Sequence, residues 1–270
     1  MADDDGGFTL SSSANGTEIN GFTIEDAGTS GNGEDGINDF AGSSGLTLED
    51  NVIQGNNEGI NLQNPDASDP AVIEDNVFAN NDQGGNIESD GDTGTAIFIS
   101  NGPANDTTIS GNTFTGDSQA AINFAGASGN NSAGLDVTDN TSTNDSTFVV
   151  ATNSTNALID GNTITTSPSA PGGFGDAILD AGANVGLRIS NNTMTATGSS
   201  SADGQAGIRL STYFGSASDS TTATSNKIKG YYYGSSLCRT TRPHTLLRTR
   251  SKLEWGWDRR PIWHERQRHK

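Results

Sequence analysis

Short stretches in which apolar and polar residues alternate recur along the first 236 residues. In each, two apolar positions are followed by a polar pair that ends in asparagine, and another apolar residue stands two positions later. This alternation predicts β-strands with one buried face. The asparagines of the motif are Asn51 (LTLEDNVI), Asn76 (AVIEDNVF), Asn112 (TTISGNTF), Asn140 (LDVTDNTS), Asn162 (ALIDGNTI), Asn192 (LRISNNTM) and Asn226 (TATSNKI). An earlier copy, TEINGFTI, has Phe22 in the asparagine's place.

A second short strand lies between successive copies of the motif. It begins at Ile37, Ile60, Ile97, Ile122, Phe148, Ile178 and Ile208. The asparagine motif returns on average about every 29 residues, which is typical of a solenoid. The shortest repeat, from Asn140 to Asn162, still has room for three short strands and three bends.

Stacked coils would explain an unusual composition. Hydrophobic residues make up 31% of the chain and aromatic residues 6%, which is too little for a layered core and would otherwise indicate disorder. Coils stacked about 4.8 Å apart need only small apolar side chains to fill a narrow interior. The motif predicts one interior row of Leu48, Ile73, Ile109, Val137, Ile159 and Ile189, and another of Ile53, Phe78, Phe114, Ile164 and Met194.

The motif asparagines are expected to be structural. Asparagine tolerates left-handed backbone angles at bends, and stacked asparagine side chains can form hydrogen bonds from coil to coil. We therefore expect Asn51, Asn76, Asn112, Asn140, Asn162 and Asn192 to form one column, without a catalytic role.

The pattern IxxNxI followed by GIxL resembles the repeat of right-handed parallel β-helix proteins, the pectate-lyase-like superfamily. The resemblance implies an all-β solenoid of about seven coils over residues 15–236, after an acidic lead-in (1–14) and before a non-repeat tail (237–270). It also implies an elongated, usually extracellular protein, whose enzyme relatives bind polysaccharide along one strand face. Unrelated activities share this fold, so it does not define a function.

Charge divides the chain near Ser236. Residues 1–236 hold 30 acidic and four basic residues, a net charge of −26, whereas the rest holds three acidic and ten basic residues, a net charge of +7. The acidic body is expected to repel nucleic acid and anionic membranes. The single cysteine (Cys238) and all histidines lie beyond Ser236, so the body has no thiol or imidazole chemistry.

No apolar stretch is long enough for a membrane span. The start, MADDDGG, lacks the basic and apolar regions of a signal peptide, so a secreted parent would imply that this chain has lost its leader or is a fragment. Seven Asn-x-Ser/Thr sequons fit a glycosylated surface protein, although chance matches are expected in such a composition. They lie at Asn15, Asn105, Asn130, Asn140, Asn144, Asn153 and Asn191.

The exposed face of the second strand is where an active site would be expected, because the enzymes that the repeat resembles carry their charged residues on one such face. With Ile60-Leu62, Ile97-Ile99, Ile122-Phe124, Phe148-Val150 and Ile208-Leu210 pointing inward, two outward rows follow. They are Asn38, Asn61, Phe98, Asn123, Val149, Leu179 and Arg209, and Phe40, Gln63, Ser100, Ala125, Ala151, Ala181 and Ser211. Neither row has a carboxylate, a histidine or a lysine, so catalysis finds little support there.

Asp180 and Arg209 are the only catalytic candidates, and they require a local slip because Asp180 is expected to point inward, as is Asp39. A structural ion pair between them is the simpler interpretation. The longest loop, Ala79–Gly94, contains Asp90 and Asp92, which could bind Ca²⁺, although their spacing matches no calcium motif. No other cofactor is expected.

The basic tail has three explanations: a nucleic-acid-binding arm, a cap over the last coil, or out-of-frame translation. The abrupt change in composition favours the third, and we expect the tail to be dispensable. For the body, we expect a non-catalytic extracellular or cell-surface module that acts as a spacer, adhesin or polysaccharide-binding surface. The alternative is a carbohydrate-active enzyme, such as a polysaccharide lyase, glycoside hydrolase or epimerase.

Overall fold

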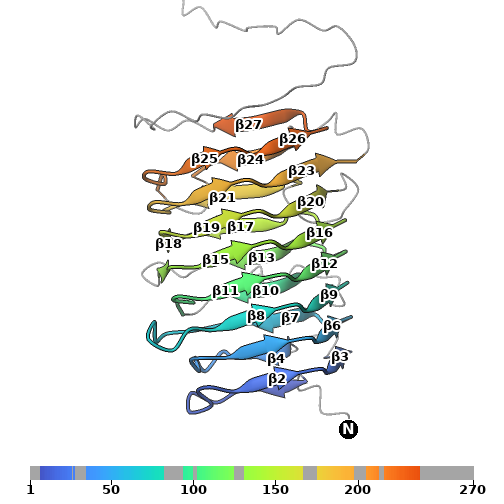
Figure 1. Cartoon of the computed structure of the whole chain (residues 1–270), viewed down its shortest axis with the longest axis vertical. Coiled ribbons are helices and arrows are strands. Elements are labelled where there is room, and N and C mark those ends of the chain that lie inside the picture. Colours follow the sequence, from blue (N-terminus) through green and yellow to red (C-terminus); the bar gives the residue numbers. More distant parts are fainter. Residues whose placement is uncertain are drawn as a thin grey trace, which may run out of the picture.

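The described part of the chain is built entirely of strands and their connections. The computed structural model describes residues 7–25, 27, 35–81, 94–99, 102–124, 131–166, 175–197, 205–212 and 216–237. Figure 1 shows the strands stacked along one long axis in the order of the sequence. The predicted calcium ligands Asp90 and Asp92, and the tail after Leu237, lie outside the described residues.

The strands form three large parallel sheets, which we name A, B and C. Sheet A contains β1 (Phe8–Thr9), β4 (Asp35–Asn38), β7 (Glu58–Asn61), β10 (Thr95–Ile99), β13 (Ala120–Phe124), β17 (Val149–Thr152), β21 (Ile178–Gly182), β24 (Ala206–Leu210) and β27 (Tyr233–Leu237). Sheet B contains β2 (Glu18–Asn20), β5 (Thr47–Glu49), β8 (Val72–Glu74), β11 (Thr108–Ser110), β15 (Asp136–Thr138), β19 (Leu158–Asp160), β22 (Arg188–Ser190) and β25 (Thr222–Thr224). Sheet C contains β3 (Thr23–Glu25), β6 (Val52–Gln54), β9 (Val77–Ala79), β12 (Thr113–Thr115), β16 (Thr141–Thr143), β20 (Thr163–Thr166), β23 (Thr193–Ala196) and β26 (Lys227–Lys229).

Each coil passes through sheet B, then sheet C, then sheet A, before the chain rises to the next coil. Within the described residues, sheets B and C each have eight strands, so the stack has eight coils where about seven were expected. The additional coil begins with the TEINGFTI copy, which forms β2 and β3. Two further short strands, β14 (Ser132–Ala133) and β18 (Ser154–Thr155), pair in a side sheet between neighbouring coils.

Both predicted interior rows are confirmed. All eleven of their side chains lie in the buried core, in which Ile109 of sheet B and Phe114 of sheet C are completely inaccessible. The rings of Phe78 and Phe114 stack at a centroid distance of 4.9 Å, because β9 and β12 are neighbours in register. Parallel pairing thus places like residues above one another and produces a continuous apolar column.

The predicted asparagine column is also confirmed, and it lies at the bend between sheets B and C. The backbone N–H of Asn112 donates to Oδ1 of Asn140 (2.9 Å), and the side-chain amide of Asn112 donates to the same oxygen (3.1 Å). The same pair of bonds links each asparagine from Asn51 to Asn192 with the next one in the column. At the first coil, the Phe22 N–H donates to Asn51 Oδ1 (2.9 Å). These bonds satisfy polar groups that would otherwise be buried without partners.

The left-handed backbone angle belongs to the residue before each asparagine, which corrects one detail of the sequence prediction. Asp50, Asp75, Asp139, Asn191 and Ser225 have φ between 54° and 58°, and glycines occupy the remaining bends. Aspartate, asparagine and glycine adopt this conformation more readily than other residues. The ladder asparagine can therefore use its side chain for hydrogen bonds to the neighbouring coils, and in three coils its amide also donates to the carbonyl two residues earlier in its own coil.

A second polar ladder, which the sequence analysis did not identify, lies at the bend after sheet C. Its members are Asn56, Asn81, Asp117 and Asp145, all completely buried. The Asn81 N–H donates to Asp117 Oδ1 and the Asp117 N–H donates to Asp145 Oδ1, both at 2.9 Å. Burial of the carboxyl raises the pKa of Asp145 to about 6, against the opposing effect of the Ser142 hydroxyl that donates to it. Two carboxyl groups thus occupy places that amides hold in the coils before them.

Candidate functional site

The outer face of sheet A carries the outward row that the sequence predicts, with one exception. Parallel pairing aligns Asn38, Asn61, Phe98 and Asn123 on neighbouring strands, and Leu179 with Arg209 further along. Their central position on sheet A makes them the natural lining of any site on this face. Much of the row is covered: Phe98 is 2% exposed and Asn61 is 7% exposed.

The exception is a register error of one residue in β17. Ile122 pairs with Val149 and Phe124 pairs with Ala151, so Val149 and Ala151 point inward and Val150 takes the outward place. The predicted inward pair Phe148-Val150 is therefore wrong at Val150. Val150 packs instead with Ala120, Leu179 and Ala181 in a separate apolar cluster on the outer side of the sheet.

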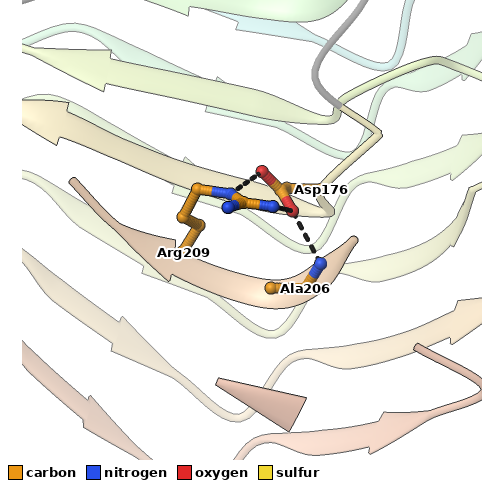
Figure 2. Close-up of polar contacts among 3 residues, drawn as sticks. All are labelled: Asp176, Ala206 and Arg209. Carbon is orange, nitrogen blue, oxygen red and sulfur yellow. Dashed lines mark hydrogen bonds and ion pairs between the residues drawn. The ribbon is translucent and has the colours of Figure 1, made fainter. Parts of the chain in front are cut away.

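Arg209 forms an ion pair with Asp176, and this contact is the principal charged feature of the face (Figure 2). The Arg209 Nε donates to Asp176 Oδ2 (2.5 Å) and its Nη2 donates to Oδ1 (2.9 Å). The Ala206 N–H also donates to Oδ1 (2.6 Å). Asp176 is completely buried, whereas the Arg209 side chain is 26% exposed. Burial raises the pKa of Asp176, and the bonds from Arg209 and Ala206 oppose that rise.

Asp180, the predicted partner of Arg209, lies on the inner side of the sheet in register with Ala151 and Leu210. Its carboxylate accepts hydrogen bonds from Ser218 Oγ (2.5 Å), Thr221 Oγ1 (2.9 Å) and Asn184 Nδ2 (2.8 Å). The slip that would have exposed it does not occur. The expected pair of Asp180 with Arg209 is thus replaced by Asp176 with Arg209, and Asp180 serves the packing of a bend.

Asp39 follows the same principle. It is completely buried and accepts hydrogen bonds from the Ser43 N–H (2.9 Å) and the Ser43 hydroxyl (2.8 Å). Burial raises the pKa of Asp39 despite these bonds. Both carboxylates that were expected to point inward are therefore interior groups with structural partners.

A third outer row, two residues before the inward isoleucines, was missed by the sequence analysis. It contains Asp35 and Glu58, which are in register on neighbouring strands and are 5% and 3% exposed, and it also contains Asp176. The outer position of this row follows from its other members, because Ala120 packs with Val150 and Asp176 binds Arg209. The face therefore has carboxylates that the two predicted rows did not reveal.

The described residues contain no cluster of side chains that could hold a metal ion. No three side chains of histidine, cysteine, aspartate or glutamate gather there as a metal site would require. In the same part of the chain, no helix is long and apolar enough to cross a membrane.

Residues 3–134 match the family model described as a right handed beta helix region. That segment includes the first three ladder asparagines, Asn51, Asn76 and Asn112, and the parallel strands that they connect. The chain is a right-handed parallel β-helix. A search of curated proteins and a search of solved structures each returned no match. In this β-helix, the same three-sheet coil continues beyond the matched segment to β27.

Proposed function

We propose that the β-helix is a non-catalytic extracellular or cell-surface module of a larger protein, which acts as a rigid spacer that presents its faces to polysaccharide or to a neighbouring cell. The observation that carries this proposal is the unbroken stack of eight coils, linked by the asparagine ladder from Asn51 to Asn226. At about 4.8 Å per coil the stack spans roughly 35–40 Å. Such a rod holds its ends at a fixed separation.

The state of the carboxylates supports a structural role. Asp176 and Asp180 each accept at least three hydrogen bonds from the protein. A general acid or base must instead present a proton or a lone pair to a substrate. The exposed sequons at Asn15, Asn144 and Asn191 are compatible with a glycosylated surface, whereas Asn140 is buried in the ladder and unsuitable as an acceptor.

A carbohydrate-active enzyme is the second candidate, and the Asp35–Glu58 pair favours it. Hydrolysis of a glycosidic bond uses two carboxyl groups a few ångströms apart, and neighbouring parallel strands place two such groups at this range. The amides of Asn38 and Asn61 on the same strands could bind sugar hydroxyls.

Screening the full chain against acidic and neutral polysaccharides distinguishes the two functions. Lyase products are detected by ultraviolet absorbance, hydrolysis by reducing-end release, and binding by retention on immobilised polysaccharide. We expect binding or no interaction, and no turnover. Turnover that is abolished by Asp35→Asn, Glu58→Gln or Asp180→Asn, in variants with an unchanged melting temperature, would contradict the proposal. Digestion by a protease added to intact cells of the source organism tests the location.

A further inference from the structure

The outer face of sheet C carries a two-dimensional array of threonines. On four successive strands, β12, β16, β20 and β23, both outward positions are threonine and the residue between them is buried. The array consists of Thr113 and Thr115, Thr141 and Thr143, Thr163 and Thr165, and Thr193 and Thr195. All eight are exposed or partly exposed, and we call them the threonine array.

The spacing of the array is regular in both directions. Neighbouring parallel strands lie about 4.8 Å apart, and alternate residues of one strand lie about 6.6–6.8 Å apart. Each threonine is paired with the threonine at the same place on the next strand. Among the described strand pairs, a shift of register is recorded only in sheet A, so the array is not interrupted by a bulge.

The backbone of the array is fixed by the neighbouring asparagine ladder. Its first threonine on each strand directly follows a ladder asparagine (Asn112, Asn140, Asn162 or Asn192), whose bonds fix one coil against the next. Threonine is β-branched, so its side chain has few alternative rotamers. None of the eight hydroxyl groups donates to or accepts from another described protein group, whereas the hydroxyls of Thr166 and Thr197 do. The hydroxyls of the array are therefore available to water or to a partner outside the chain.

The charge of this face is unlike that of the rest of the body. On the six strands of sheet C from β6 to β23, no outward residue is charged. Four of these strands carry the threonine array, and the other two carry Val52, Gln54, Val77 and Ala79. Charges return only at the ends of the sheet, at Glu25 and at Lys227 with Lys229. In a body with a net charge of −26, such a face is complementary to an uncharged partner. It has no aromatic side chain, on which a sugar ring would stack.

We propose that the threonine array binds ice. Ice is an uncharged lattice in which oxygen atoms repeat along two directions, at lengths close to the two spacings of the array. The hydroxyl groups can bond to lattice water, while the methyl groups lie between them and order the water at the surface. Because strands and rotamers are fixed beforehand, little conformational freedom is lost on adsorption. This inference concerns the outer face of sheet C and does not rest on the function proposed above for the β-helix as a whole.

Measurements of thermal hysteresis, and of adsorption of the fluorescently labelled full chain to a single ice crystal, test the proposal. The wild-type protein is expected to separate the melting and freezing temperatures and to coat the crystal. Thr141→Lys and Thr163→Lys should each lose most of both effects, because a long charged side chain lifts the flat array from the lattice. Thr138→Lys on sheet B is the matched control, since Thr138 is also an outward strand residue, and it should retain both effects.

Several outcomes would overturn the proposal. One is a folded wild-type protein that neither adsorbs to ice nor shows hysteresis, and another is an equal loss in Thr138→Lys. Retention on crystalline cellulose that depends on Thr141, without adsorption to ice, would assign the array to a carbohydrate instead. Should a lysine variant fail to fold, Thr141→Leu provides the same test without a charge, with far-ultraviolet circular dichroism as the folding control.

Discussion

Sheets B and C are alike inside and different outside. Both have eight short strands, in each of which an inward residue stands between two outward ones, and all these inward residues are buried except Ile228 in the last strand of sheet C, which is partly buried. The outward positions of sheet B are mixed and include Glu18, Glu49, Glu74, Asp136, Asp160 and Arg188. Those of sheet C are uncharged over six strands and are threonine at all eight positions of four strands.

The difference shows which part of the sequence the fold constrains. Threonine favours strands in general, but this preference applies to both sheets and cannot explain its concentration in one of them. Sheet B forms equally well with glutamate, aspartate, leucine or arginine outside. The fold therefore requires the interior rows and the ladder, whereas the outward rows remain available for function.

Substitutions in the interior should have the largest effects on the free energy of unfolding, and these effects should be similar beneath sheets B and C. Ile109→Ala in sheet B and Phe114→Ala in sheet C each remove a completely buried side chain. Each should lower the free energy of unfolding by about 3–5 kcal/mol, because a close-packed column cannot fill the cavity. Urea unfolding followed by circular dichroism measures both. A large loss in one sheet and a negligible loss in the other would refute the equivalence of the two interiors.

The second largest loss of stability is expected from substitutions in the asparagine ladder at the bend between sheets B and C. Asn140→Ala removes the acceptor for Asn112 and the donors to Ile109 O and Asn162 Oδ1. Leaving such groups buried without partners should lower the free energy of unfolding by roughly 3 kcal/mol. Thr138→Ala, on the surface of sheet B, is the control and should change it by about 0.5 kcal/mol or less. Equal melting temperatures of the two variants would show that the ladder is not needed.

The second ladder gives a prediction that depends on pH. Because the pKa of Asp145 is raised to about 6 in the fold, its protonated form is favoured there. Its contribution to stability is complete below about pH 4 and is lost as the pH rises through 6. The Asp145→Asn side chain stays uncharged at every pH. It places an amide at this position of the ladder, as Asn56 and Asn81 do in earlier coils. Relative to the wild type, the free energy of unfolding of this variant should therefore increase between pH 4 and pH 8, by about 3 kcal/mol at most.

Melting temperatures at both pH values measure this effect, with Asp50→Asn as the matched control at an exposed bend. A gain for Asp145→Asn that is larger at pH 4 than at pH 8 would contradict the buried-carboxyl account.

The fold was predictable because the interior repeats. The first ladder, from Asn51 to Asn226, recurs with the same residue in nearly every coil, so its period is visible despite loops of different length. The second ladder changes from asparagine to aspartate between Asn81 and Asp117, which conceals its common role. At the start of β17, the run Phe148–Val150 is apolar at every position, so alternation could not decide which residues point inward.

The candidate site was less predictable, because it depends on residues that alternation does not mark. Asp35, Glu58 and Asp176 stand where the chain enters sheet A, and they belong to an outer row although the residue two positions later, which alternation would place on the same side, points inward. Arg209 was found, but its partner was sought at Asp180, four residues after Asp176 in the chain. Which carboxylate a long arginine reaches is decided in three dimensions.

The central claim, that the interior and the ladders specify the fold while the threonine array does not, is tested most directly by removing hydroxyl groups from the array. The variant Thr141→Val, Thr143→Val, Thr163→Val and Thr165→Val preserves shape and strand preference. Since these hydroxyls have no partner in the described protein, its free energy of unfolding in urea should differ from that of the wild type by about 1 kcal/mol or less. A loss of several kcal/mol would show that the array holds the coils together, and would contradict the account.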